Sequence, residues 1–243
     1  MVEEMEKKEI KKTQVFNVVI LDRSGSMNCI RKAAVDGFNE TLAGIHKAQD
    51  KFADTQEHYV SLVTFCSCDT KHVFDKTPVK ETRPLSIDDY QPCCTTPLYD
   101  AMGITLTSMQ GHVKTLEDSV VVVTIITDGL ENASREYSGK AIKALVERLR
   151  GEGWTFTYMG ANQDAVEVAS ELSIRNSRNF AYDEEGTMMS MKKDSNTRMN
   201  FFSKLAKAKI SNFINDTEPV SAEERHRMYT CMADEAFDEE ENK

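Results

Sequence analysis

Two long apolar runs constrain the fold of this chain more than any other feature. Residues 15–22 read VFNVVILD, and residues 119–128 read SVVVVTIITD. A strand with one face in solvent alternates apolar and polar residues, whereas these runs are apolar at nearly every position. Both are therefore predicted to be strands buried on both faces, as in a parallel sheet that helices cover on each side.

Segments with helical periodicity separate the predicted strands. Apolar residues recur every three or four positions within residues 30–45, 98–113 and 141–149. Further strands are predicted at 58–66, 154–160 and 178–183, with another helix at 164–172. This alternation predicts an α/β domain with a Rossmann-like, doubly wound, mostly parallel six-stranded sheet and helices on both faces.

One strand is expected to run against the others. Residues 71–80, KHVFDKTPVK, follow the preceding strand after only a few residues. So short a link forms a hairpin, and the strand is therefore antiparallel to its neighbour. Pro78 has no amide hydrogen to donate, which favours a position at the edge of the sheet.

Composition divides the chain into three parts. Residues 1–13 are a charged N-terminal segment, residues 14–185 form the α/β domain, and residues 186–243 form a helical C-terminal extension with an acidic tail. The methionine-rich start of the extension predicts a packing helix, and a docking surface for a partner is the alternative. The acidic end, DEAFDEEENK, is predicted to be solvated.

The charge and hydropathy patterns exclude several classes of function. The 243 residues include 30 Lys and Arg against 40 Asp and Glu, and no basic cluster indicates a nucleic-acid partner. The first residues, MVEEMEKKEIKK, lack the apolar core of a signal peptide, and no window approaches a membrane span of about 20 apolar residues. We therefore expect a cytoplasmic protein without a membrane partner; the sequence predicts no oligomeric state.

Oxygen-bearing side chains follow both apolar runs. DRSGS after the first run places Asp22, Ser24 and Ser26 at alternate positions, and TDG after the second contains Asp128. Thr96 precedes the predicted helix that begins near Leu98. Because sites in open α/β sheets form at the carboxyl ends of the strands, these side chains are expected at one edge.

The chemistry of this set indicates a hard divalent cation. Two carboxylates and three hydroxyls suit Mg²⁺, or Mn²⁺ or Ca²⁺, and not zinc or copper. So few charged ligands leave the cation with waters and one position that a carboxylate of another molecule can take. Two interpretations stay open, because the same residue types also cap helices and form turns without a metal. Thr96, next to Pro97, can cap the following helix, bind a ligand, or do both.

These residues resemble the metal-ion-dependent adhesion site of von Willebrand factor type A (vWA) domains. The family pattern is Asp-x-Ser-x-Ser, then a distant Thr and a distant Asp, which DRSGS, TTPLYDA and TDG match in order over roughly residues 14–185. The family Thr precedes x-Leu-x-x-Ala, so Thr96 is its counterpart and not Thr95. The resemblance implies one metal, bound directly by the serines and partly through water by the acids. The implied ligands are Asp22, Ser24, Ser26, Thr96 and Asp128.

The resemblance also implies a function. It points to a metal-dependent protein–protein interaction module, and not an enzyme, whose protein partner supplies an Asp or Glu ligand to the metal. In the expected lack of an export signal, the sequence resembles the cytosolic bacterial members of the family. Those members often work beside ATPases, kinases or phosphatases in stress or resistance systems. The sequence does not identify the partner.

A Mg²⁺-dependent phosphatase of the haloacid dehalogenase type is the alternative from another functional class. It too has an Asp after the first strand, but its general acid is a second Asp two residues later. Here that position is Ser24, which cannot act as a general acid near neutral pH. The histidines are scattered, and no catalytic residue is predicted.

Two cysteines depart from the family pattern, and two more are expected near the same rim of the sheet. Cys93 and Cys94 precede the Thr pair, where relatives usually have small residues or glycine, and Cys66 and Cys68 follow the second strand. Three states stay open for them. Unpaired thiols are the favoured interpretation, a disulfide under oxidation is the second, and a Cys₄ zinc site is the third. The zinc site fits the ligand type but not the usual spacing of two residues between ligands.

Overall fold

The computed structural model describes residues 10–128, 130–160, 165–179, 184–218 and 220–242. The strands are β1 (Thr13–Asp22), β2 (Gln56–Phe65), β3 (Thr70–Pro78), β4 (Ser119–Thr127), β5 (Thr155–Gly160) and β6 (Asn176–Asn179). The helices are α1 (Arg31–Lys51), α2 (Leu98–Val113), α3 (Gly139–Gly151), α4 (Ala165–Glu171), α5 (Glu184–Ile214) and α6 (Ala222–Glu241). Short 3₁₀ helices span Gly25–Ile30 and Val79–Glu81.

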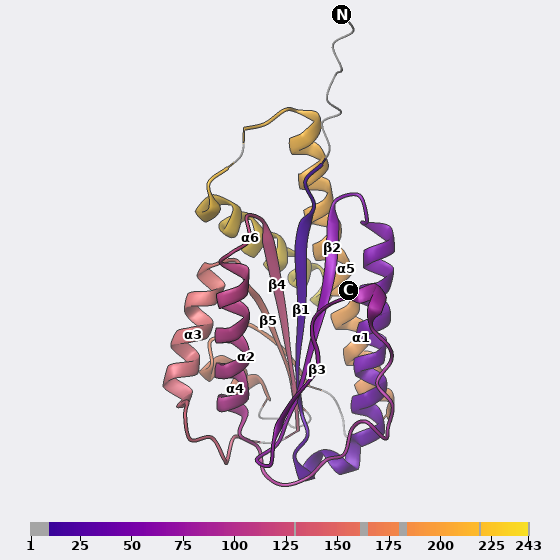
Figure 1. Ribbon diagram of the computed structural model, residues 1–243, viewed down its shortest axis with the longest axis vertical. Helices are drawn as coiled ribbons and strands as arrows, with labels where there is room; N and C mark the ends of the chain where they lie inside the picture. Colours follow the sequence, from indigo (N-terminus) through magenta and orange to yellow (C-terminus); the bar gives the residue numbers. More distant parts are fainter. Residues whose placement is uncertain (1–9, 129, 161–164, 180–183, 219, 243) are drawn as a thin grey trace, which may run out of the picture.

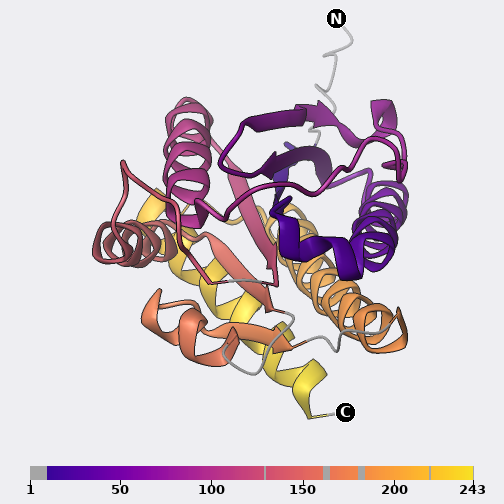
Figure 2. The same cartoon turned by 90° about the horizontal axis from the view of Figure 1, so that it is seen from below.

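The predicted sheet is confirmed. Its strand order is β3-β2-β1-β4-β5-β6, and all neighbouring pairs are parallel except β2 with β3. The antiparallel strand lies at an edge, as the short hairpin and Pro78 predict. Figure 1 shows the strands as one twisted layer between helices, and Figure 2 shows the same molecule from below.

The two apolar runs become β1 and β4, the central pair of the sheet. Phe16 and Ile20 of β1 pack in one core cluster with α2 and α3, whereas Val19 and Leu21 pack in another with α1. In Figures 1 and 2, α2, α3 and α4 lie on one side of the sheet, and α1 and α5 lie on the other. Burial on both faces explains why these strands need apolar residues at nearly every position.

The last strand differs from its predicted range. β6 starts at Asn176, two residues before the predicted segment 178–183, and residues 180–183 lie outside the described residues. The prediction followed the aromatic residues of that segment. The observed strand instead pairs the backbone of polar residues with β5, in the register Thr157 with Asn176, and an edge strand needs no apolar run for such pairing.

The region after the α/β units contributes to the core. Phe201 and Phe202 of α5 cluster with Val15 and Val120 of the sheet, and Met191 is fully buried. The prediction of a methionine-bearing packing helix is therefore confirmed, while the domain boundaries at 13/14 and 185/186 stay predictions. Within the described part of the chain, no helix combines the length and apolar character needed to cross a membrane.

Most acidic side chains of the C-terminal end are exposed, as predicted, but this end is helical and packs partly on the rest of the chain. Residues 234–241 form the last turns of α6, in which Ala236 is fully buried. The acidic side chains are held by basic partners, because Lys204 bonds to Glu235 and Glu239 at 3.0 and 2.9 Å. The local composition did not predict these ion pairs, since the basic partners come from distant parts of the chain.

A buried ion pair attaches α5 to the centre of the sheet. Arg198 and Asp194 are 5% and 1% exposed, and the Arg198 Nε donates to Asp194 Oδ2 at 2.7 Å. The same guanidinium donates to Asn17 of β1 at 3.3 Å and to Thr124 of β4. Charges removed from water in this way stabilise a fold only while every partner is present.

Removing one partner of this pair is predicted to be costly. Asp194→Ala leaves the Arg198 guanidinium buried without its counter-charge, so the free energy of unfolding should fall by about 3–5 kcal/mol. Urea unfolding followed by circular dichroism measures the change. Glu223→Ala breaks an exposed pair of the same i,i+4 spacing with Arg227 and should change stability by less than about 1 kcal/mol. Equal effects of the two variants would contradict the prediction.

A second charged network joins the start of β4 to the C-terminal helices. Asp118, 9% exposed, accepts bonds from Lys209 at 2.5 Å, Thr13 at 2.7 Å and Tyr229 at 2.8 Å. Burial alone raises the pKa of the Asp118 carboxyl, but these three donors and the Lys209 charge outweigh burial and hold the pKa below its usual range. The folded state therefore favours the ionised carboxylate.

The sign of this shift predicts a pH dependence. Stability from the ionised Asp118 is fully present well above the unfolded-state pKa of about 3.9 and is lost as the pH falls through the lower folded-state value. Asp118→Asn should therefore be less stable than wild type at pH 7, and the difference should shrink towards pH 3. Urea unfolding at several pH values tests this. A difference that is constant over the range would show that Asp118 does not titrate as argued.

Candidate metal centre

The end of β1 holds the first predicted ligand in a fixed position. Asp22 is fully buried, and its Oδ1 accepts the Ser24 backbone N–H at 2.7 Å. Its Oδ2 accepts the Thr127 hydroxyl at 2.7 Å, across the β1–β4 pair. The Tyr90 hydroxyl donates to the main-chain carbonyl of Asp22. The carboxylate thus keeps one orientation at the carboxyl edge of the sheet.

Three other predicted ligand oxygens form a row beside Asp22. The Ser24 and Ser26 hydroxyl oxygens lie 3.1 Å apart, and the Ser26 hydroxyl donates to Asp128 Oδ1 at 2.8 Å. The row forms because the turn after β1 brings the alternate serines together and because β4 ends beside β1. The spacing that the sequence pattern suggested therefore places these oxygens within contact of one another.

Backbone hydrogen bonds hold the Thr96 loop over this edge. Gly25 N–H donates to the Cys94 carbonyl at 2.9 Å, and Cys93 N–H donates to the Arg23 carbonyl at 2.8 Å. Thr96 N–H donates to Asn132 Oδ1 at 2.9 Å, and Asn132 N–H returns a bond to the Thr96 carbonyl at 3.1 Å. The loop is therefore bound both to the turn after β1 and to the loop after β4.

The alternative in which Thr96 caps α2 is wrong. The helix begins at Leu98 with Pro97 in the cap position, and its first backbone N–H groups donate to Glu131 and Ser134 of the loop after β4. Thr96 is 2% exposed, and no hydrogen bond within the described residues engages its hydroxyl. Thr95, in contrast, is exposed at the surface. The hydroxyl of Thr96 is thus available to a ligand.

The electrostatics of the site favour a cation. Burial raises the pKa of Asp22 to about 6, against the opposing bonds from Thr127 and Ser24, and the charge of Asp128 adds to the rise. Burial likewise raises the pKa of Asp128. Two buried carboxyl groups this close are costly to ionise together, and a divalent cation between the oxygens would offset that cost.

The oxygen spacing fits a small octahedral cation. Ligands at about 2.0–2.1 Å from Mg²⁺ in octahedral geometry are about 3 Å apart when adjacent, whereas Ca²⁺ distances of 2.3–2.6 Å give about 3.3–3.7 Å. The observed separations are 3.1 and 2.8 Å. These separations are those of ordinary hydrogen bonds, so they are compatible with a small divalent cation without selecting Mg²⁺ over Ca²⁺, and the five residues stay the predicted ligands.

Several residues that organise the site were missed from the sequence. Thr127 orients Asp22, Tyr90 holds its carbonyl, and Asn132 holds Thr96. Tyr90 is fully buried although it comes from a mainly polar loop, and its aromatic side chain was the only feature of the sequence that indicated burial. Asn132 lies four residues after Asp128, and nothing in the local sequence indicates its bond to a loop that precedes α2.

Comparisons with known proteins address the fold. No protein-family model and no curated protein matches the chain. Among solved structures, the pilus adhesin SpaC from Lactobacillus rhamnosus GG aligns with a TM-score of 0.58 and 13% identity, over 80% of this chain and 32% of SpaC. The SpRpn10 VWA domain aligns with a TM-score of 0.51 and 8% identity, over 75% of this chain and 95% of that domain.

The chain has the vWA fold. Manganese-loaded TRAP protein from Plasmodium vivax also aligns, with a TM-score of 0.49 and 15% identity, over 75% of this chain and 74% of that protein. At these identities the likeness concerns the backbone alone, and the argument for a metal rests on the oxygens of this chain itself. They lie at the carboxyl ends of its central strands, where open α/β sheets form their sites.

The glycine between the two serines is predicted to matter for this vWA site. A Cβ on Gly25 would lie 3.3 Å from the Cys94 carbonyl oxygen, so Gly25→Ala should push the Thr96 loop away and cost about 1 kcal/mol of stability. Titration with Mn²⁺ should show weaker binding. Gly111→Ala is the control, because an added Cβ there meets nothing within 4 Å. Unchanged Mn²⁺ affinity in Gly25→Ala would contradict this role.

Proposed function

We propose that this chain is a metal-dependent protein-interaction module that binds Mg²⁺ and, through it, an acidic side chain of a partner protein. The row of Ser24, Ser26 and Asp128 oxygens at the end of the central strands carries the proposal. Hydroxyls and carboxylates are the ligands that Mg²⁺ takes from proteins, and few of them are charged. A bound cation would therefore keep an electrophilic position that a partner carboxylate can fill.

Each predicted ligand has a distinct task in this proposal. Ser24 and Ser26 offer neutral oxygens directly, while Asp22 and Asp128 supply the negative charge that attracts the ion. Asp22 would contribute its charge without binding the ion directly, since both of its carboxylate oxygens already accept hydrogen bonds at 2.7 Å. Thr96 adds a third hydroxyl from a loop that is hydrogen-bonded to both neighbouring loops.

A groove beside the site is the proposed place for the partner. It has a volume of about 710 Å³ and runs from Thr95 and Pro97 to Asn132 and Arg135. The lining holds Arg135 but also Asp69, Asp100 and Glu136, so the preference for an acidic segment rests on the bound cation and not on the charge of the groove. The cytoplasmic location and a bacterial stress or resistance setting belong to the same proposal, and they rest on family-level resemblance alone.

The proposed role is binding and not catalysis. Asp22 is fully buried with both oxygens engaged, so it is poorly placed to attack a phosphate, and Ser24 stands where a phosphatase would have its general acid. His58 is 2% exposed against Phe202, and burial lowers its pKa to about 3. No observation favours the haloacid dehalogenase alternative.

The test is a calorimetric titration of metal-free protein with Mg²⁺ and Mn²⁺. Ser26→Ala removes the hydroxyl that links Ser24 to Asp128, and it should weaken binding by more than about tenfold. Asp50→Ala, an exposed carboxylate on α1, is the matched control and should bind like wild type. Circular dichroism checks that each variant is folded.

The same titration tests the partner chemistry. Free glutamate should raise the Mn²⁺ affinity of the wild type, because a carboxylate that completes the coordination must be linked reciprocally to metal binding. Glutamine, which has the same shape without the charge, should not. Absence of metal binding both with and without glutamate would refute the proposal.

A further inference from the structure

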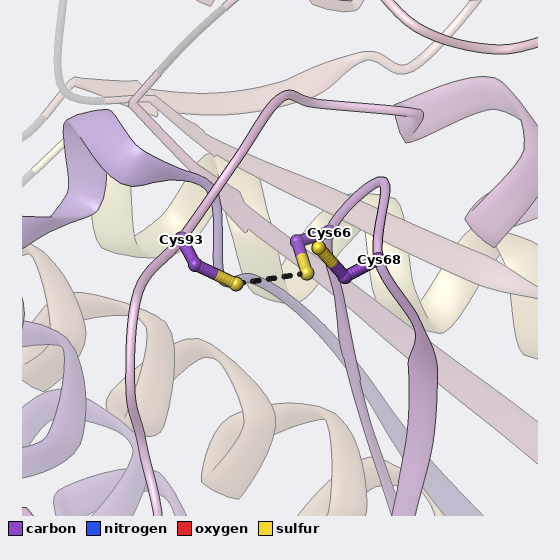
Figure 3. A group of neighbouring side chains, drawn as sticks. All are labelled: Cys66, Cys68 and Cys93. Atoms are coloured by element: carbon purple, nitrogen blue, oxygen red, sulfur yellow. Dashed lines mark hydrogen bonds between the residues drawn. The ribbon is translucent and has the colours of Figure 1, made fainter.

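Four cysteines converge at the rim next to the oxygen site. Cys66 and Cys68 come from the turn between β2 and β3, and Cys93 and Cys94 come from the loop that carries Thr96. The sulfur atoms of Cys66 and Cys93 lie 3.3 Å apart, and those of Cys68 and Cys94 lie 2.8 Å apart. Figure 3 shows Cys66, Cys68 and Cys93 pointing toward one another, with their sulfurs all within 4.8 Å.

The backbone holds the two segments in this arrangement. Ser67 N–H donates to the Thr95 carbonyl at 3.0 Å, and the Thr95 N–H donates back to the Ser67 hydroxyl at 3.2 Å. Cys66 is only 2% exposed, at the end of β2. The convergence of the thiols is thus built into the fold and is not an accident of long surface side chains.

Strain at Cys94 supports a role for the cluster. Cys94 has a φ of 59°, in the left-handed region that costs a residue other than glycine about 1 kcal/mol or more. Adjacent side chains of an extended chain point in opposite directions. The left-handed residue breaks that alternation, so Cys93 and Cys94 both contact cysteines of the facing turn.

The sulfur spacing fits a shared metal. Zinc–thiolate bonds of about 2.3 Å in a tetrahedron place the sulfurs about 3.8 Å apart. The sulfurs of Cys66, Cys68 and Cys93 all lie within 4.8 Å of one another, and the Cys94 sulfur joins them through Cys68 at 2.8 Å. Two disulfides, between Cys66 and Cys93 and between Cys68 and Cys94, would also use all four sulfurs. They would not explain why the Cys68 sulfur also lies within 4.8 Å of the Cys66 and Cys93 sulfurs, whereas a shared ion explains it. The short C-x-C and C-C spacings are no obstacle, because the ligands face one another from two segments.

A buried cation faces the same cluster. Arg23, 5% exposed, donates from Nη1 to the Cys93 sulfur at 3.5 Å, and its Nη2 pairs with Asp69. The guanidinium thus places a positive charge beside the sulfurs that would carry the negative charge of metal-bound thiolates. Four thiolates around Zn²⁺ leave a net charge of −2, and Arg23 is placed to offset part of it.

We propose that Cys66, Cys68, Cys93 and Cys94 bind one Zn²⁺ ion. Binding releases the four thiol protons to solvent, with no change in oxidation state. The ion would clamp the loop of Thr96 to the turn after β2, and so support the neighbouring oxygen site. The two sites differ in chemistry, since thiolates select a soft cation and the oxygen site selects a hard one.

Cobalt substitution tests this proposal in the full chain. Reduced, metal-free protein titrated with Co²⁺ should develop thiolate-to-cobalt charge-transfer absorption and the visible bands of tetrahedral Co²⁺. Both should saturate at one equivalent and bleach when Zn²⁺ is added. Cys93→Ser and Cys68→Ser should lose these bands, whereas Cys29→Ser and Cys231→Ser, which change cysteines outside the cluster, should keep them.

One further variant distinguishes the oxygen site from the thiol site in the experiment. Ser26→Ala should retain the charge-transfer bands, so that a failure of the proposed Mg²⁺ site would not be mistaken for a failure here. The zinc proposal is overturned if the reduced wild type shows no bands, or if the bands survive Cys93→Ser. The zinc proposal is also overturned if mass spectrometry detects disulfide bonds in protein that binds no Zn²⁺.

Discussion

The pairing of β1 with β4 is the constraint on which the rest of the structure depends. Their parallel register sets Leu21 beside Ile126, so that the following residues, Asp22 and Thr127, meet at the strand ends. Parallel neighbours need burial on both faces, which the helices on each side of the sheet provide. The same register that organises the core therefore determines which polar groups gather at its carboxyl edge.

The site combines buried charge with precise support. Burial raises the pKa of both Asp22 and Asp128, so the cost of ionising the two carboxyl groups together follows from their position in the fold. Hydrogen bonds from Thr127 and the Ser24 backbone hold Asp22 in one orientation and limit that rise. Preorganised oxygens of this kind need little rearrangement to receive an ion, and this reduces the entropic cost of binding.

Sequence patterns predicted those features that depend on local chemistry. The two-sided burial of β1 and β4, the edge position of β3, and the oxygens after each central strand all follow from residue types at short spacing. The predictions were incomplete where distant residues decide the outcome. The acidic end becomes helix because Lys204 and the apolar surface of the core are available to it, and β6 forms by backbone pairing that side-chain patterns do not record. Asn132 and Tyr90 escaped notice for the same reason, since their partners Thr96 and Asp22 are far away in sequence.

The loop from Cys93 to Thr96 belongs to both proposed sites, and this shared membership has a mechanical consequence. Its backbone is bonded to Arg23 and Gly25 on one side and to Ser67 on the other. In these proposals, a change that pulls the thiols together or releases them would be transmitted to Thr96, because the loop between them is short and is hydrogen-bonded to segments on both sides. A coupling free energy between the two sites requires only that one position of this loop suits both ligand sets. Arg23 strengthens the connection, since the residue between Asp22 and Ser24 also contacts the Cys93 sulfur. In the zinc proposal, the cysteines are therefore a second means of positioning Thr96.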